Sequence, residues 1–171
     1  GNLGTSQAVF KSIEKDLKST SGIMNLNTCN DFEQIASYVG SLNIEHSSPQ
    51  GINTDNVLLG STFIVGGQIK GQQHELYLVY PQGNYIRPAD SKPYLVIGEV
   101  KYGKPILDRV IKPNVSIGDA SRCALISMDS TLKSDLTVGP PIDFAVLKKD
   151  ADNLSTLECL NVTDENYSKV C

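Results

Sequence analysis

The order in which hydrophobic periodicity changes along the chain constrains its fold more than any other feature. Apolar residues first repeat at helical spacing, then β-branched and aromatic runs alternate between glycine-rich turns, and both patterns return once more. We predict helices at 5–18, 31–44, 102–111 and 116–133, and strands at 57–67, 75–80, 85–87, 94–98, 142–147 and 156–162. This order favours a layered α+β domain, in which pairs of helices flank a mainly antiparallel sheet system.

Local residues refine these predictions. Thr5 or Ser6 is expected to cap the first helix, and Asp31 or Asn30 the second, where Gly40 weakens the centre. Residues 47–56 read as a loop because Ser, Pro, Gly and Asn dominate them. The segment 94–98 is apolar on both faces and is predicted to be a central strand. The helix at 116–133 has apolar positions broad enough to imply burial between layers.

Length and charge limit the possible classes of protein. The chain has 171 residues and 18.5 kDa, so we expect a single domain over residues 1–171. Its 15 Lys and Arg against 19 Asp and Glu give a net charge of −4, which leaves no basic face for nucleic acid. No apolar stretch approaches the roughly 20 residues that a membrane helix needs. We therefore expect neither nucleic-acid binding nor membrane insertion.

The cysteine spacing argues against a metal site. The four cysteines are scattered without a C-x-x-C pair: Cys29, Cys123, Cys159 and Cys171. Neither a zinc ribbon nor a thioredoxin-type site is therefore predicted, and we expect no metal and no cofactor. Free thiols favour the reducing cytoplasm, although four Asn-x-Ser/Thr sequons leave secretion as the less favoured alternative.

The residues alone do not identify an active site. His46 and His74 are expected on the surface, and Gly66-Gly67 lacks the rest of a phosphate-binding motif, so close strand packing explains it better. Glu99 precedes a helix, where the helix dipole favours a carboxylate whatever its function. The Ser- and Asp-rich stretch 127–137 is typical of helix ends and turns.

Five strings, in order along the chain, carry a resemblance to a known family. They are GNLGTSQ at 1–7, FIVGGQIKG at 63–71, IGEVKYGKPILDR at 97–109, SMDST at 127–131 and VGPPID at 138–143. Together they resemble Anbu, a bacterial family of proteasome-related peptidases, from the first residue to about residue 151.

This resemblance implies a four-layer αββα sandwich of the N-terminal-nucleophile hydrolase type, incomplete here because its first strands are absent. In such enzymes the nucleophile is an N-terminal threonine whose own amine acts as the local base. Gly1 has no hydroxyl, so the resemblance places that threonine upstream, in a segment of roughly seventy residues.

The resemblance also assigns accessory catalytic residues and partners. Glu99 falls where proteasome β-subunits place a serine beside the threonine amine, and Asp135 falls where an aspartate orients that serine. Val138 occupies the position of a second accessory serine, which departs from the proteasome pattern. The family implies a homo-oligomer, either a ring or a helical assembly, that hydrolyses unfolded peptides in the cytoplasm.

Two other functions remain open. The chain could belong to a non-catalytic scaffold or regulatory subunit that acts by assembling with a complete partner. A self-standing ligand-binding α+β module needs no further residues, but it leaves the series of motifs unexplained.

Overall fold

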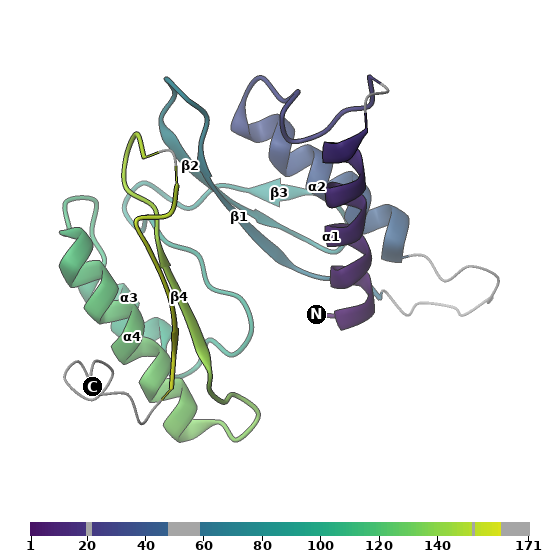
Figure 1. Ribbon diagram of the computed structural model, residues 1–171. Helices are drawn as coiled ribbons and strands as arrows, with labels where there is room; N and C mark the ends of the chain where they lie inside the picture. The colour runs from purple at the N-terminus through teal and green to yellow at the C-terminus, as the bar shows by residue number, and fades with distance from the viewer. Residues whose placement is uncertain (20–21, 48–58, 152, 162–171) are drawn as a thin grey trace. The chain divides into compact units, whose positions relative to one another are not determined.

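The computed structural model describes residues 1–19, 22–47, 59–151 and 153–161 (Figure 1). Within them the chain forms four α-helices and two antiparallel sheets, in the order ααβββααββ. These elements divide into two units, Gly1–Pro88 and Ala89–Cys171, each of which is described by itself. The mixed helix-and-sheet content and the antiparallel pairing predicted from the sequence are thus confirmed.

Two helices open the first unit, α1 (Leu3–Lys18) and α2 (Phe32–Ser47). α1 begins earlier than predicted, because Asn2 is its cap and accepts a hydrogen bond from the Thr5 backbone N–H at 3.1 Å. The prediction that Thr5 or Ser6 caps this helix is therefore wrong. The predicted Asp31 cap of α2 is confirmed, since its carboxylate accepts from the Gln34 N–H at 2.8 Å.

The first unit also holds a three-stranded sheet of β1 (Phe63–Gln68), β2 (His74–Val79) and β3 (Tyr85–Ile86), ordered β1-β2-β3. The strands predicted at 57–67, 75–80 and 85–87 pair as two consecutive antiparallel hairpins, and Gly71 and Gly83 occupy the turns with φ of +83°. Residues 59–62 of the predicted strand 57–67 do not belong to β1, and residues 57–58 lie outside the described residues. Most of the predicted loop at 47–56 lies outside the described residues.

The core of the first unit lies where α1 and α2 cover one face of this sheet (Figure 1). β1 and β2 pair in a register that places Phe63 opposite Val79 and Val65 opposite Tyr77, so these side chains share the covered face. Val79 is fully buried, which stabilises the fold by about 1.5–3 kcal/mol. Further buried apolar side chains of this core are Val9, Phe32, Ile35, Ala36, Val39 and Leu42.

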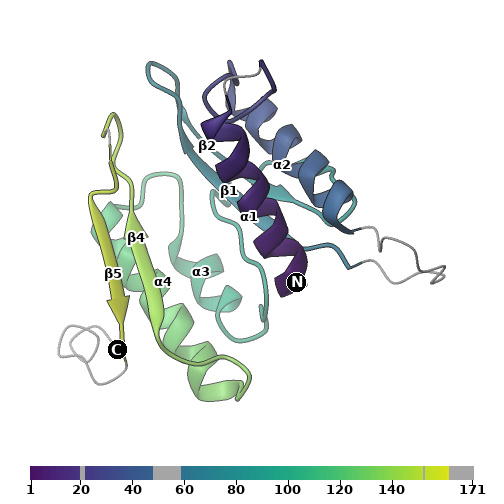
Figure 2. The same ribbon diagram turned by 45° about the vertical axis from the view of Figure 1, so that its right-hand side comes forward.

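The second unit contains α3 (Lys104–Val110), α4 (Ile117–Ser134), β4 (Ile142–Val146) and β5 (Thr156–Leu160). Ser116 caps α4, because its hydroxyl accepts a hydrogen bond from the Asp119 N–H at 3.0 Å. β4 and β5 form an antiparallel pair alongside α4 (Figure 2). Their small core consists of Ile142, Leu160, Leu125, Leu132 and Phe144.

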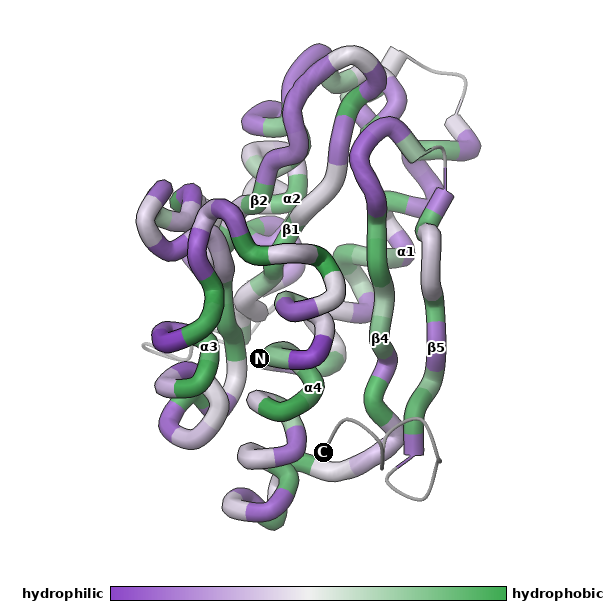
Figure 3. Tube along the Cα trace, turned by 90° about the vertical axis from the view of Figure 1, so that its left-hand side faces the viewer, coloured by the Kyte–Doolittle hydropathy of each residue, from purple (hydrophilic) through white to green (hydrophobic). Residues whose placement is uncertain are grey.

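Two expectations for the second unit are wrong. The segment 94–98 forms no strand, because within the described part of the chain no other strand pairs with it. α4 is also not buried all round: apolar and polar residues intermix along it (Figure 3), and Ile126 and Met128 remain 40% and 38% exposed. Its buried residues are Cys123, Ser127 and Thr131, which lie on a single face at i, i+4 and i+8.

Candidate active site

Glu99 lies in the irregular segment between Pro88 and α3. It follows Gly98, whose φ of +83° turns the chain sharply. The Glu99 side chain is exposed, and its Oε1 accepts a hydrogen bond from the Lys101 backbone N–H at 2.6 Å. The carboxylate is thus held against its own loop while one oxygen remains available to another partner.

Asp135 ends α4, where its backbone N–H donates to the Thr131 carbonyl at 2.8 Å. Its Oδ1 accepts two hydrogen bonds from Thr137, one from the hydroxyl at 2.7 Å and one from the backbone N–H at 2.8 Å. The Thr137 hydroxyl is the larger cause, and the backbone N–H the second, of a lowered pKa at the Asp135 carboxyl. Asp135 is therefore a half-buried, ionised acceptor suited to orienting a neighbouring donor.

The structure brings the two segments, but not the two carboxylates, into contact. Gly103 packs on α4 so closely that a Cβ there would overlap the Ser127 hydroxyl and approach the Thr131 hydroxyl to 3.0 Å. Gly103 follows Glu99 by four residues, and Thr131 precedes Asp135 by four. Among the described residues no hydrogen bond or ion pair joins Glu99 to Asp135.

Val138 and Gly1 lack side chains that could act in hydrolysis. Val138 contributes only a backbone hydrogen bond, from its N–H to the Asp135 carbonyl at 3.1 Å. Gly1 belongs to the first unit, where its backbone borders Ser61. Neither residue supplies a hydroxyl.

A group of residues that the sequence analysis missed surrounds Asp108 on α3. Lys92 and Lys104 each contact the Asp108 carboxylate at 2.7 Å, and Lys104 lies 5.9 Å from the centre of the Tyr94 ring. Hydrogen bonds from Lys104, and then from Lys92, hold the pKa of Asp108 well below its usual range. The i,i+4 spacing of Lys104 and Asp108 on a predicted helix was the only sequence signal for this group.

The histidines fit no hydrolytic triad. We predicted that His46 is a solvated surface residue. Instead, its Nε2 forms a hydrogen bond of 2.8 Å with the Ser12 hydroxyl, between α2 and α1. No carboxylate among the described residues lies within hydrogen-bonding distance of His46. His74 is exposed at the start of β2. The Ser12–His46 hydrogen bond thus ties α1 to α2, but the third group that would orient a catalytic base is missing among the described residues.

Gly66 and Gly67 serve packing, which confirms the interpretation of this motif. A Cβ at Gly66 would overlap the Leu76 side chain, and one at Gly67 would lie 3.1 Å from the Phe32 ring. Across the described ranges no three His, Cys, Asp or Glu side chains are grouped so that they could hold a metal ion. In the same part of the chain, no helix is both long enough and apolar enough to cross a membrane.

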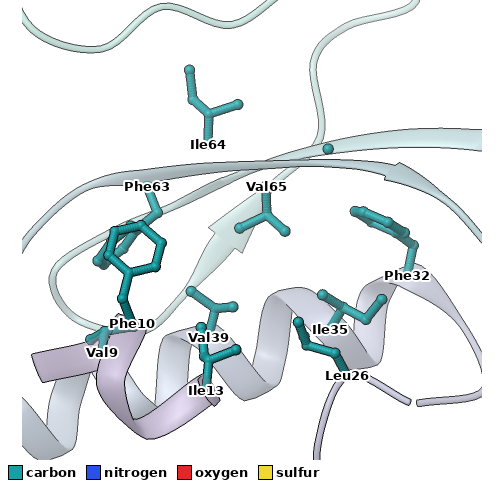
Figure 4. Close-up of a pocket in the computed structure, with 11 residues that line it drawn as sticks. Val9, Phe10, Ile13, Leu26, Phe32, Ile35, Val39, Phe63, Ile64 and Val65 are labelled. Carbon is teal, nitrogen blue, oxygen red and sulfur yellow. The ribbon is translucent and has the colours of Figure 1, made fainter. Parts of the chain in front are cut away.

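A pocket of about 360 Å³ lies between α1, α2 and β1 (Figure 4). Its lining carries no charged side chain and consists of Val9, Phe10, Ile13, Leu26, Phe32, Ile35, Val39, Phe63, Ile64, Val65 and Gly66. Sites that act on small substrates combine apolar walls with a few polar groups that fix orientation. Because this lining offers none, the pocket is a poor candidate for the chemistry.

Comparison with known proteins gives matches among solved structures. No protein-family model matches the chain, and a search of curated proteins gives no match. Anbu from Hyphomicrobium sp. strain MC1 is 36% identical with a TM-score of 0.88, over 99% of this chain and 70% of that one. Anbu from Yersinia bercovieri, described as an ancestral beta-subunit, is 34% identical with a TM-score of 0.88, over 99% and 72%.

A third structure is described as the helical assembly of the Anbu complex from Pseudomonas aeruginosa. It is 36% identical with a TM-score of 0.84, and the match covers 99% of this chain and 70% of that one. Identity above 30% along nearly the whole chain, with TM-scores of 0.84–0.88, establishes the relationship. The chain belongs to the proteasome-related Anbu family.

Proposed function

We propose that this chain is part of a proteasome-like threonine peptidase subunit that hydrolyses peptide bonds. The proposed nucleophile is an N-terminal threonine of the mature subunit that is not among residues 1–171, and its own amine acts as the local base. The observation that carries this proposal is the 34–36% identity to Anbu structures along 99% of the chain. The chain spans 70–72% of the length of these relatives.

Glu99 and Asp135 are the accessory residues of the proposed site. Glu99 is exposed with one carboxylate oxygen bonded only locally, which suits a group that faces a threonine amine. Asp135 keeps its charge because of the bonds from Thr137, so it can orient a donor throughout the neutral pH range. Gly103 supports the joint role, because it packs Glu99's segment against the helix that Asp135 ends.

We propose the four-layer αββα sandwich, in one domain over residues 1–171, as the fold of this part. Each sheet carries apolar side chains on the face that its own helices leave open. In the first unit Ile64 points away from α1 and α2, whereas Phe63 and Val65 point toward them (Figure 4). In the second unit Leu157, on the side of β5 opposite Leu160, is 69% exposed. An exposed apolar face of this kind is typical of a sheet that packs against a second sheet.

We further propose that the subunit assembles with copies of itself into a ring or helical complex that admits unfolded peptides in the cytoplasm. The relative from Pseudomonas aeruginosa, described as a helical assembly, supports the assembly. The substrate class and the compartment are expectations from the family and follow from the proposed peptidase.

The test uses the intact subunit with its mature N-terminal threonine, assembled and assayed on fluorogenic peptides. A peptide boronate, which adds to an activated threonine hydroxyl, reports the nucleophile independently of substrate choice. Asp135→Asn and Glu99→Gln should each lower kcat by about 100-fold. Glu158→Gln, which alters an exposed carboxylate on β5, is the matched control and should leave kcat unchanged.

The outcomes separate the proposed functions. Normal turnover in both variants would remove Glu99 and Asp135 from the site but keep the peptidase. A subunit that neither binds the boronate nor cleaves peptides, although it assembles, would instead be the non-catalytic scaffold.

A further inference from the structure

Both ends of the segment that carries Glu99 are held by one carboxylate. Lys92 lies seven residues before Glu99 and contacts Asp108 Oδ1 at 2.7 Å. Lys104 lies five residues after Glu99 and contacts Asp108 Oδ2 at 2.7 Å. Each oxygen of Asp108 thus binds a different lysine, and residues 92–104 form a loop closed through a single side chain.

The aromatic ring of Tyr94 completes this closure. The Lys104 ammonium lies 5.9 Å from the ring centre, within the range of a cation–π interaction. The Tyr94 hydroxyl is buried, and no hydrogen-bond partner for it is present among the described residues. Burial raises the Tyr94 pKa, so the hydroxyl stays neutral beside the Asp108 carboxylate. Tyr94 therefore contributes a packing surface under Lys104 rather than a charge.

Regular backbone pairing does not fix the shape of this loop. Residues 89–103 contain no helix or strand, and the backbone hydrogen bonds within 89–104 are the short-range turns of Lys92 to Ala89, Tyr94 to Lys92 and Lys104 to Val100. Near the end of the loop, Gly103 packs on α4. Asp108, by contrast, lies on α3, which packs against α4. The two ion pairs therefore link an irregular segment to the pair of helices that ends at Asp135.

We propose that Asp108 is a positioning residue for Glu99, which it fixes relative to α4 by closing residues 92–104 through Lys92 and Lys104. This inference rests on the proposed function, in which Glu99 faces the reacting threonine. Exposed ion pairs contribute little to overall stability. The effect of Asp108 is consequently local: it selects one conformation of a segment that has no ladder of backbone bonds of its own.

The experiment uses the assembled subunit with its mature threonine. Four variants are compared with the wild type: Asp108→Asn, Asp108→Glu, Glu99→Gln and the Asp108→Asn/Glu99→Gln double variant. Arg122→Gln is the matched control, because it breaks an exposed ion pair with Asp119 of 2.6 Å elsewhere in the same unit. Hydrogen exchange of residues 94–103 reports the closure, and kcat and KM against pH report the reaction.

We expect Asp108→Asn to raise hydrogen exchange of residues 94–103 about fivefold and to lower kcat about tenfold with KM unchanged. Asp108→Glu should recover part of the lost kcat. In the Glu99→Gln background, Asp108→Asn should cause no further loss of kcat, because it acts through Glu99. Arg122→Gln should change neither readout.

The contrary outcomes are distinguishable. Unchanged exchange, or independent multiplication of the Asp108→Asn and Glu99→Gln losses, overturns the positioning role of Asp108. Wild-type kcat in Glu99→Gln overturns the proposed role of Glu99, and the positioning role falls with it. Loss of kcat in Glu99→Gln but not in Asp108→Asn overturns the inference about Asp108 alone.

Discussion

Asn43 and Ser61 are polar residues with almost no exposed surface, at 0% and 1%. The Asn43 amide donates to the carbonyls of Ser61 at 2.6 Å and Tyr80 at 3.1 Å, and its oxygen accepts from the Ser61 N–H at 3.1 Å. One side chain on α2 thus satisfies backbone groups on the two segments that flank the β1–β2 hairpin. Buried polar groups are costly only when they lack such partners.

Replacing Asn43 with alanine should lower the free energy of unfolding by about 2–4 kcal/mol, because the Ser61 N–H would stay buried without a partner. Chemical denaturation measures this change. Ser41→Ala removes an exposed hydroxyl that bonds its own helix at Ser37 and should change stability by less than about 0.5 kcal/mol. Equal effects of the two substitutions would contradict the assigned role of Asn43.

Alkaline pH should destabilise the first unit through Tyr77. Burial, followed by a hydrogen bond to Glu75, raises the Tyr77 pKa to about 12. The unfolded tyrosine ionises near pH 10 while the folded one stays protonated, so the folded state binds more protons and stability falls as the pH rises from about 10 to 12. Tyr77→Phe should flatten this decline. The free energy of unfolding is measured by denaturation at several pH values, and tyrosinate absorbance reports the ionisation. If Tyr77→Phe leaves the slope of stability against pH unchanged, Tyr77 is not the cause of the decline.

At the scale of elements, α2 meets the β2–β3 turn through two glycines. A Cβ at Gly40 would overlap the Gly83 carbonyl oxygen, and Gly83 itself has a φ of +83°. Glycine usually weakens a helix, and the sequence alone therefore predicts that Gly40 weakens the centre of α2. The structure shows instead that its missing side chain allows the close approach.

Gly40→Ala should therefore destabilise the protein by about 1–3 kcal/mol, although alanine is the better helix former. Gly118 in the first turn of α4 is the matched control, because a Cβ there would have no neighbour closer than 3.9 Å. Gly118→Ala should stabilise by up to about 1 kcal/mol. Thermal unfolding of both variants shows whether each substitution raises or lowers stability. Stabilisation by both would contradict the close contact between Gly40 and Gly83.

The elements that the sequence predicted well are those defined by local periodicity. The four helices, the β1–β2 hairpin and the β4–β5 pair follow from apolar spacing and turn residues. The segment 94–98 has the same apolar character, but a strand also requires a neighbour for its backbone bonds, which local sequence cannot supply. The Asn2 cap was missed because Thr5, the expected cap, bonds instead to the distant Leu59 carbonyl at 2.6 Å.

The candidate site was less predictable. Glu99 and Asp135 were selected only through the family resemblance, since isolated carboxylates near helix ends have many roles. The sequence did not predict the role of Asp108, because an irregular segment without periodicity brings one of its partners, Lys92, to it. Only the i,i+4 partner Lys104 could be inferred from the sequence.

Across the whole molecule, the two units bury very different amounts of apolar surface. Ten apolar residues form the described core of the first unit, whereas Ile142 and Leu160 form that of the second with partly buried neighbours. Amides of α2 and β2 in the chain of residues 1–171 should thus exchange hydrogen about 100-fold more slowly than those of α4 and β4. Hydrogen exchange measured by mass spectrometry checks this prediction. Val39→Ala should accelerate the exchange of amides in the first unit only. Equal protection of the two sets of amides would contradict the inferred difference in core size.

The hydrogen bonds at the start of α1 also have a consequence for folding kinetics. The Ser61 hydroxyl donates to the Asn2 carbonyl at 2.8 Å and accepts from Ser6 at 2.8 Å, across 59 and 55 residues of sequence. Contacts this distant in sequence carry a high loop-closure entropy before any stabilisation is gained. The β1–β2 hairpin, closed by a short turn, can form far earlier. We therefore expect α1 to dock last during refolding and to detach first when the unit unfolds.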